Sequence, residues 1–179
     1  MKVQEIGQET SDFSLADLAG STRSLRRELA DRKAAVVIFW SCVCSHCVRY
    51  DEYLNGFQER HPDIVLLTVA SRQQESVAEL RRAVEDRRLV FPILMDPGGR
   101  VAKGWATEQT PRAFLIGADM VLQYRGAIDN FQFSGDPDYA AYLEPAIEDL
   151  LAGRPIAKPE TPSFGCAIQS VYYQLQKII

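Results

Sequence analysis

Three of the four cysteines in this chain of 179 residues are Cys42, Cys44 and Cys47. The last two form a C-x-x-C pair that follows an apolar run, residues 34–40, and precedes a predicted helix beginning near Ser45. This order places the first sulfur of the pair at a helix N-terminus, where the dipole and free backbone N–H groups favour a thiolate. Because the thiolate is the reactive form of cysteine, the spacing predicts thiol–disulfide exchange.

The two cysteines of the pair have different expected roles. We expect Cys44, nearer the solvent, to attack a disulfide and Cys47, one helical turn further on, to resolve the mixed disulfide. His46 lies between them and would favour the thiolate and make the disulfide more oxidising. A metal half-site is the alternative, but only Cys166 and His61 remain as further ligands, so redox chemistry is favoured.

Two cysteines lie outside the pair. Cys42, at the end of the predicted strand, is interpreted as a small buried hydrophobic residue, with a disulfide partner or third metal ligand as the alternative. Cys166 follows a proline-containing connector and could return to the active-site face to form a disulfide with Cys42 or Cys44. Its alternative is an untethered cysteine in the chain's tail.

The dipeptide Thr110–Pro111 precedes an apolar strand predicted at residues 113–116, and proline is expected at the start of a strand. A cis peptide bond here would turn the Thr110 backbone toward the loop that holds Cys44. That backbone could then bind an extended polypeptide or a mixed disulfide. Without further information a trans bond is the commoner state.

Two segments resemble the thioredoxin superfamily. Residues 39–47 (FWSCVCSHC) resemble its F-W-A-x-W-C-x-x-C active-site signature, and residues 110–116 (TPRAFLI) resemble its cis-proline segment. Residues 1–29 are similar to the entry segment of the redoxin branch, which includes the AhpC/TSA proteins. The resemblance covers about residues 10–152.

The resemblance implies a thioredoxin-like three-layer α/β sandwich with a mixed central sheet and helices on both faces. It also implies a thiol–disulfide oxidoreductase with Cys44 as nucleophile, Cys47 as resolving thiol and Pro111 in the cis form. Thr110 and Trp40 are expected to contact the substrate, which would be a protein or small-molecule disulfide, dithiol or thiol reductant. The implied redox group is the disulfide itself, with no cofactor and no metal.

Departures from the family pattern affect the chemistry. Val43 replaces the usual tryptophan, Ile38 takes the position of the buried acid of thioredoxin, and Glu52 that of the helix-kinking proline. A proton acceptor for Cys47 must therefore come from elsewhere, such as water or Glu108.

Two other functions stay open. One is a thiol peroxidase using Cys44, with Cys47 or Cys166 as resolver, although the peroxiredoxin signature P-x-x-x-[TS]-x-x-C is absent. The other is a non-enzymatic copper- or zinc-binding module using Cys42, Cys44 and Cys47.

Hydrophobic periodicity predicts alternating strands and helices in one domain, residues 1–152, followed by an extension, residues 153–179, with Cys166. The expected strands cover residues 34–40, 63–70, 91–95, 113–116 and 121–125, and the expected helices 24–30, 45–60, 73–88, 100–105 and 139–152.

Charge and hydropathy limit the partners. The net charge of −4 and the scattered arginines give no sign of nucleic-acid binding, and no apolar run is long enough to span a membrane. Residues 1–12 lack the apolar core of a signal peptide, so we expect a cytoplasmic protein, or a periplasmic one if a signal has been removed. The apolar terminal residues 171–179 are expected to pack on the domain or on a second copy, as a homodimer contact.

Overall fold

The computed structural model of the chain describes residues 4–133 and 135–169. A seven-stranded sheet in the order β2-β1-β5-β4-β3-β7-β8 forms its centre, and β6 pairs with β9 in a separate two-stranded sheet. The strands are β1 (Ser14–Asp17), β2 (Thr22–Ser24), β3 (Ala34–Trp40), β4 (Ile64–Ala70), β5 (Ile93–Met95), β6 (Gln109–Thr110), β7 (Arg112–Gly117), β8 (Leu122–Gly126) and β9 (Cys166–Ala167). The helices are α1 (Leu25–Leu29), α2 (Ser45–Val48), α3 (Asp51–Asn55), α4 (Phe57–Arg60), α5 (Val77–Arg87), α6 (Arg100–Gly104) and α7 (Leu143–Leu151).

The middle of the large sheet is mixed, as predicted. Strand β3 pairs in parallel with β4 and antiparallel with β7. Every residue of β3 and β4 is buried, because helices cover both faces of the sheet. Their continuous apolar sequences made these two strands the most predictable elements of the chain.

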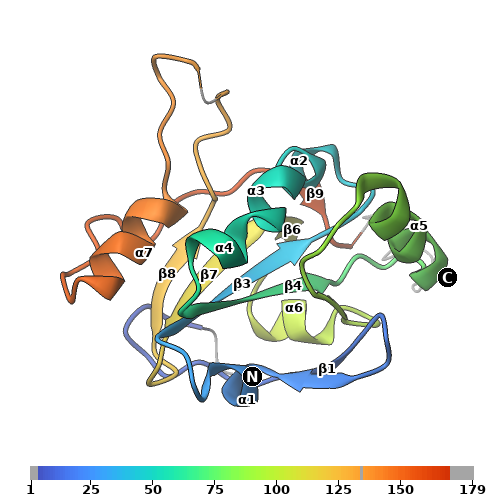
Figure 1. Cartoon of the computed structure of the whole chain (residues 1–179), viewed down its shortest axis with the longest axis horizontal. Coiled ribbons are helices and arrows are strands. Elements are labelled where there is room, and N and C mark those ends of the chain that lie inside the picture. The colour runs from blue at the N-terminus through green and yellow to red at the C-terminus, as the bar shows by residue number, and fades with distance from the viewer. Residues whose placement is uncertain (1–3, 134, 170–179) are drawn as a thin grey trace, which may run out of the picture.

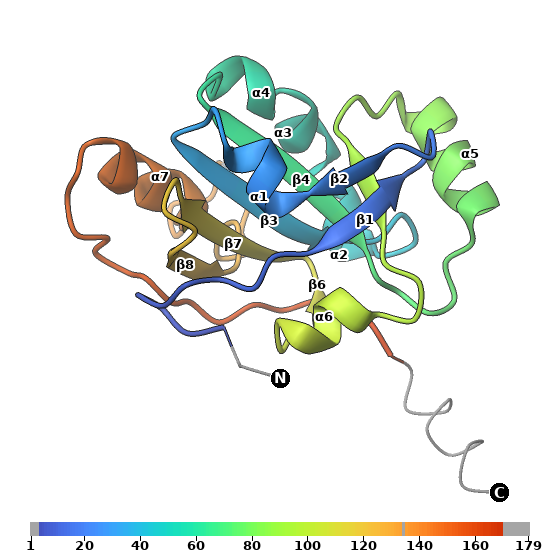
Figure 2. The ribbon, with the colours of Figure 1, turned by 90° about the horizontal axis from the view of Figure 1, so that it is seen from below.

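Alternate residues of β3 face opposite sides of the sheet and belong to two separate cores. One core contains residues of α3, α4, α5 and α7, and the other contains residues of α1 and α6. Figures 1 and 2 show these helices on the two sides of the sheet. The predicted three-layer sandwich is therefore confirmed.

The single helix expected over residues 45–60 is instead three short helices, α2, α3 and α4. The backbone dihedral angles depart from ideal α-helical values at two residues: Tyr50 (φ −100°, ψ 3°) and Gly56 (φ −85°, ψ 0°). The apolar residues keep helical spacing across both interruptions, so the periodicity alone indicated one helix.

Other predicted elements are present with shifted ends. Helix α5 begins at Val77, because Ser76 and Glu79 form a capping box that fixes its first turn. Helix α7 begins at Leu143, later than predicted, while α1 is capped by Ser24 as expected. Strands β2, β6 and β9 were not predicted.

The connector after α7 is extended, as its prolines indicated, and packs along β8. The Arg125 amide donates to the Pro159 carbonyl (3.0 Å), and the Thr161 amide donates to the Arg125 carbonyl (3.1 Å). The chain then continues past β7 to β6 near α6 (Figure 2). The terminal residues 171–179, on which the packing and homodimer expectations depend, lie outside the described residues.

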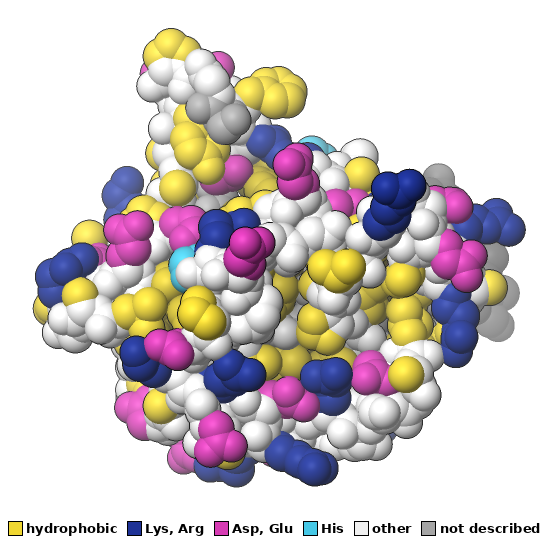
Figure 3. Space-filling view, in the orientation of Figure 1, with side chains coloured by type: hydrophobic (Ala, Val, Ile, Leu, Met, Phe, Trp, Pro, Cys, Tyr) yellow, Lys and Arg dark blue, Asp and Glu magenta, His cyan; other side chains and the backbone are white. Residues whose placement is uncertain are grey.

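None of the helices in residues 4–133 and 135–169 has the length and apolar character needed to cross a membrane. Figure 3 shows acidic and basic side chains interspersed on one face, and a loop between β8 and α7 projecting from it with apolar side chains.

Candidate active site

Cys44 and Cys47 lie where β3 leads into α2. Cys44 is the N-cap residue of α2, and its carbonyl accepts from the amides of Cys47 (2.9 Å) and Val48 (3.1 Å). Both cysteine side chains are wholly buried (0% exposed), and all four cysteines are free thiols in the structure. The pair is thus at the strand–helix junction that the sequence predicted.

The environment of Cys44 favours its thiolate. A hydrogen bond from the Cys47 thiol makes the largest contribution to a pKa lowered to about 4, against the opposing effect of burial. The side chain and backbone of Cys166 and the side chain of Thr110 lower this pKa further. In its thiol form Cys44 donates to the Thr110 carbonyl at 3.3 Å.

Cys47 has the opposite character. Burial raises the pKa of its thiol, and the neighbouring Cys44 sulfur raises it further. Cys47 is therefore held as a proton donor to Cys44, which fits the expected division between an attacking and a resolving thiol.

The sequence predicted that the helix dipole and His46 favour the Cys44 thiolate, and this stays a prediction. Helix α2 has only four residues, so few aligned peptides contribute to a dipole. His46 is exposed and packs edge-on against Phe131, with ring centroids 5.8 Å apart.

Trp40, which we expected to contact the substrate, is buried in the structure. Its ring is fully buried, its Nε1 donates to Asp51 (3.3 Å), and the Arg87 guanidinium lies over it at 5.2 Å. All of these partners belong to the domain's own core and helices, so Trp40 positions α3 and α5.

Cys42 is part of a loop held by charged groups. The Glu75 carboxylate accepts from the Cys42 amide (2.5 Å) and the Ser41 hydroxyl (3.0 Å), and Arg87 donates to the Cys42 carbonyl (3.1 Å). Burial, with Glu75 adding to it, raises the pKa of Cys42 to about 12. A thiol so firmly protonated is a poor nucleophile, in line with the packing role that the sequence favoured.

The Thr110–Pro111 peptide bond is cis, as the resemblance implied, and Thr110 is buried beside Cys44. Thr110 is also the end of β6, whose partner is β9 of the same chain. In that pairing Thr110 lies opposite Cys166, and its hydroxyl donates to the Cys166 carbonyl at 3.5 Å. The sequence left open whether Cys166 returns to the active-site face, and in the structure it does.

Apolar side chains surround the site. Val43 and Val48, which flank the cysteine pair, are exposed, as are Phe133 and Phe164. Phe164 packs on Phe131 with centroids 5.9 Å apart. Sequence reasoning missed this group, since the phenylalanines lie more than 80 residues from the motif along the chain.

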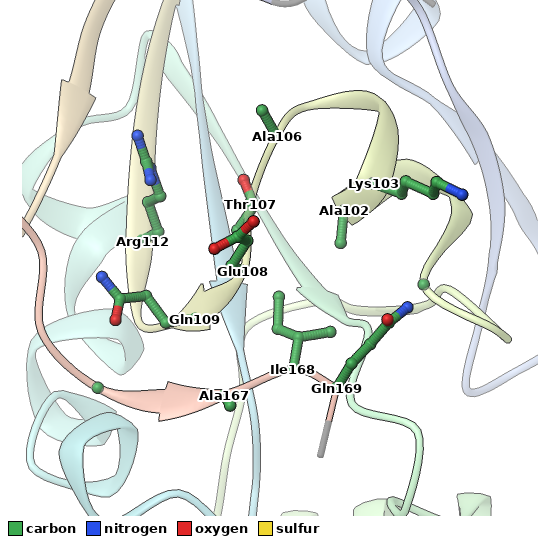
Figure 4. A pocket seen from close by; sticks show the side chains of 12 residues that line it. Ala102, Lys103, Ala106, Thr107, Glu108, Gln109, Arg112, Ala167, Ile168 and Gln169 are labelled. Carbon is green, nitrogen blue, oxygen red and sulfur yellow. The ribbon is translucent and has the colours of Figure 1, made fainter. Parts of the chain in front are cut away.

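A cavity of about 700 Å³ lies beside β9, on the side toward α6. Figure 4 shows Arg112 and Gln109 on one side of it, Lys103 on the other, and Glu108 between. Glu108, suggested as a proton acceptor for Cys47, faces this cavity and is not among the groups that affect the Cys47 thiol.

A copper or zinc site, the alternative function, requires several ligand side chains to lie around one point. Across residues 4–133 and 135–169, no three His, Cys, Asp or Glu side chains are arranged to hold a metal ion. This includes the combination of Cys42, Cys44 and Cys47 with His46.

A model of the AhpC/TSA family matches residues 6–125, which is more than half of the chain and contains Cys44, Cys47 and Pro111. The chain belongs to the AhpC/TSA family. Cys166 and its strand lie outside the matched residues.

The curated relatives of this AhpC/TSA protein are bacterial. The thiol-disulfide oxidoreductase ResA of Bacillus thuringiensis is 29% identical over 117 residues, which cover 64% of this chain and 65% of that protein. The thioredoxin-like protein YneN of Bacillus subtilis is 26% identical over 123 residues, covering 68% and 70%. The chain thus spans somewhat less than two thirds of ResA.

Solved structures extend the likeness beyond the family match. A hypothetical protein from Sinorhizobium meliloti is 27% identical, with a TM-score of 0.81, and the likeness covers 93% of this AhpC/TSA chain and 95% of that one. A secreted disulfide oxidoreductase of Mycobacterium tuberculosis, 19% identical with a TM-score of 0.57, shares the fold over 78% of this chain and 95% of that one. The first likeness is long enough to extend into the segment after residue 152.

Proposed function

We propose that this protein is a thiol–disulfide oxidoreductase whose redox group is the Cys44–Cys47 pair, with no further cofactor. The observation that carries the proposal is the placement of the two thiols: Cys44 is the N-cap residue of α2, 3.3 Å from the carbonyl of the cis Thr110–Pro111 peptide, and Cys47 lies within the helix. Cys44 has a pKa lowered to about 4 by its hydrogen-bond donors, whereas burial keeps Cys47 protonated. Such a pair supplies an attacking thiolate together with a resolving thiol.

In the reducing direction, the Cys44 thiolate attacks one sulfur of a substrate disulfide. The substrate S–S bond breaks, a mixed disulfide forms, and the other substrate sulfur leaves with the electron pair and takes up a proton. Cys47 then loses its proton and attacks the Cys44 sulfur. This forms the Cys44–Cys47 disulfide and releases the second substrate thiol, so that the substrate is reduced and the enzyme oxidised.

A polypeptide substrate fits the surroundings of the pair. The exposed Val43, Val48 and Phe164 offer apolar contacts to a partner chain, as at other protein interfaces. The Thr110 backbone, which pairs with β9 in this structure, is an edge on which an extended peptide can pair once β9 is displaced. The ResA relatives are themselves named thiol-disulfide oxidoreductases.

The central test is reduction of insulin disulfides by dithiothreitol, followed as turbidity. We expect the Cys44→Ser variant to lose the activity completely, because a serine hydroxyl cannot form the mixed disulfide. Cys42→Ser is the matched control and should retain most of the activity, since Cys42 is protonated and bonded to Glu75 through its backbone.

Full activity in Cys44→Ser would overturn the proposal. Stopped-flow measurement with hydrogen peroxide separates it from the peroxidase alternative. An oxidoreductase of the proposed type should react with peroxide far more slowly than with a disulfide.

A further inference from the structure

The nucleophile of the proposed reaction is covered in this structure. The Cys44 side chain is 0% exposed, although an external disulfide must reach its sulfur directly. Burial of a catalytic sulfur beneath the chain's own backbone means that some segment must move before a substrate binds. Residues 163–168 reach this place at Cys166, which pairs with Thr110, the residue whose carbonyl lies 3.3 Å from the Cys44 sulfur.

This segment is held on the Thr110 edge by a ladder of contacts. Cys166 pairs with Thr110 and Ala167 with Gln109, in antiparallel register. The Ile168 amide donates to the Glu108 carbonyl at 2.9 Å. The Gln109 side chain donates to the Ser163 carbonyl, so the segment is held at both of its ends.

The fit is closest at Gly165. A Cβ atom built there would lie 1.8 Å from the Thr110 carbonyl oxygen and 3.1 Å from the Pro111 nitrogen. Only glycine allows the strand to lie this close to the loop beside Cys44. The next residue, Cys166, lies opposite Thr110 in the strand pair, and its carbonyl accepts from the Thr110 hydroxyl at 3.5 Å.

An extended backbone paired at Thr110, with a sulfur at Cys44, is the arrangement that a bound disulfide substrate needs. We propose that residues 163–168 are an internal substrate strand, and that Cys166 exchanges with the Cys44–Cys47 disulfide to form a Cys44–Cys166 disulfide. The proposal rests on the proposed function, because it uses the same Cys44 chemistry.

The exchange needs no external oxidant. Starting from the oxidised pair, Cys166 loses its proton to water and its sulfur attacks the Cys44 sulfur. The Cys44–Cys166 bond forms as the Cys44–Cys47 bond breaks, and Cys47 leaves with the electron pair and takes up a proton. One disulfide replaces another, and the reverse attack by Cys47 regenerates the first.

External substrates therefore compete with an intramolecular strand. A tethered thiol acts at a high effective concentration. Because β9 already pairs with Thr110, an external substrate must displace β9 before it can pair there. The extension thereby lowers the rate of the enzyme toward disulfides that bind the Thr110 edge weakly.

The test uses the full-length Cys47→Ser protein, dilute and treated with the thiol oxidant diamide. We expect a monomer with a Cys44–Cys166 disulfide as the main product, identified by non-reducing peptide mapping. Adding Gly165→Val should reduce its yield at limiting diamide by at least about tenfold, because displacing the strand removes the preorganised thiol. Gly135→Val is the matched control, since a Cβ at Gly135 meets nothing within 4 Å.

Thermal melting checks that each variant is folded. The Cys47→Ser experiment tests the proposal by itself, even where a glycine variant fails to fold.

A main product linking Cys42 to Cys166, or Cys42 to Cys44, would overturn the proposal. So would an equal yield in folded Gly165→Val. If the internal disulfide fails to form while the wild-type protein reduces insulin, only the internal strand is refuted. If it forms and insulin is not reduced, the proposed function fails instead.

Discussion

At the scale of single residues, the reactivity of Cys44 depends on three hydrogen-bonding neighbours that the motif itself does not reveal. Cys47 was evident from the C-x-x-C spacing. Thr110 and Cys166 come from positions 66 and more residues away along the chain, brought to the sulfur by β6 and β9. The thiolate is therefore a product of tertiary structure.

These neighbours predict the ionisation of Cys44. Since its folded pKa is lowered to about 4 from the ordinary thiol value of 9.0, the thiolate is present above about pH 4. The stability that it adds to the reduced protein is complete above the ordinary thiol pKa and is lost progressively as the pH falls from there to about 4. Thiolate absorbance at 240 nm should titrate there in a Cys42→Ser background. Replacing Cys166 by alanine should raise the midpoint, because one donor is lost.

The comparison variant is Cys47→Ala, which should raise the Cys44 midpoint more than Cys166→Ala, since Cys47 is the largest contributor. A midpoint in Cys166→Ala equal to that of the parent protein would show that Cys166 does not bond to the thiolate.

At the scale of elements, α5 controls the loop that leads into the cysteine pair. The capping box at Ser76 fixes where the helix begins, and this sets Glu75 against the amide of Cys42. Arg87, at the other end of α5, bonds to the Cys42 carbonyl. One helix thus holds both sides of this residue in place.

Removing the Glu75 carboxylate should destabilise the domain. Because it accepts two hydrogen bonds at a partly buried site, we expect Glu75→Ala to lower the free energy of unfolding by about 1.5–3 kcal/mol in urea titration. Cys42 should also be alkylated faster by iodoacetamide, since the carboxylate helps to raise its pKa. The exposed Glu85 on the same helix provides the control, and an equal loss in Glu85→Ala would contradict the assignment.

The elements also explain where sequence reasoning succeeded and failed. Strand β3 was predictable at both ends because its seven residues are continuously apolar. The burial of Trp40 could not be predicted in the same way, because a strand without polar–apolar alternation does not indicate which face of the sheet each side chain lies on. Strand β9 has two residues and no periodicity, so only the return of the connector could identify it.

At the scale of the whole molecule, the connector joins the far end of the sheet to the active site. Thr161 is its anchor on β8. Its hydroxyl accepts from the Ala127 amide (3.1 Å) and bonds to the Tyr124 hydroxyl (2.7 Å), all in the protein interior. The anchor lies five residues before Cys166.

Replacing Thr161 by valine keeps the shape and removes both hydrogen bonds. We expect a loss of about 1–3 kcal/mol in stability, because buried partners are left unpaired, and a lower yield of the Cys44–Cys166 disulfide in the Cys47→Ser protein. Thr161→Ser keeps the hydroxyl and should retain most of both properties. Unchanged urea denaturation in Thr161→Val would contradict this role for the connector.

The close approach of Gly165 to the Thr110 carbonyl also limits which foreign peptides can replace the strand. A peptide that takes the register of β9 places the residue before its cysteine where Gly165 now lies, and a side chain there meets a backbone oxygen at 1.8 Å. The same contact that seats the chain's own strand therefore acts as a selectivity filter. For peptides in this register, we expect glycine–cysteine sequences to be accepted and those with a larger residue before the cysteine to be rejected.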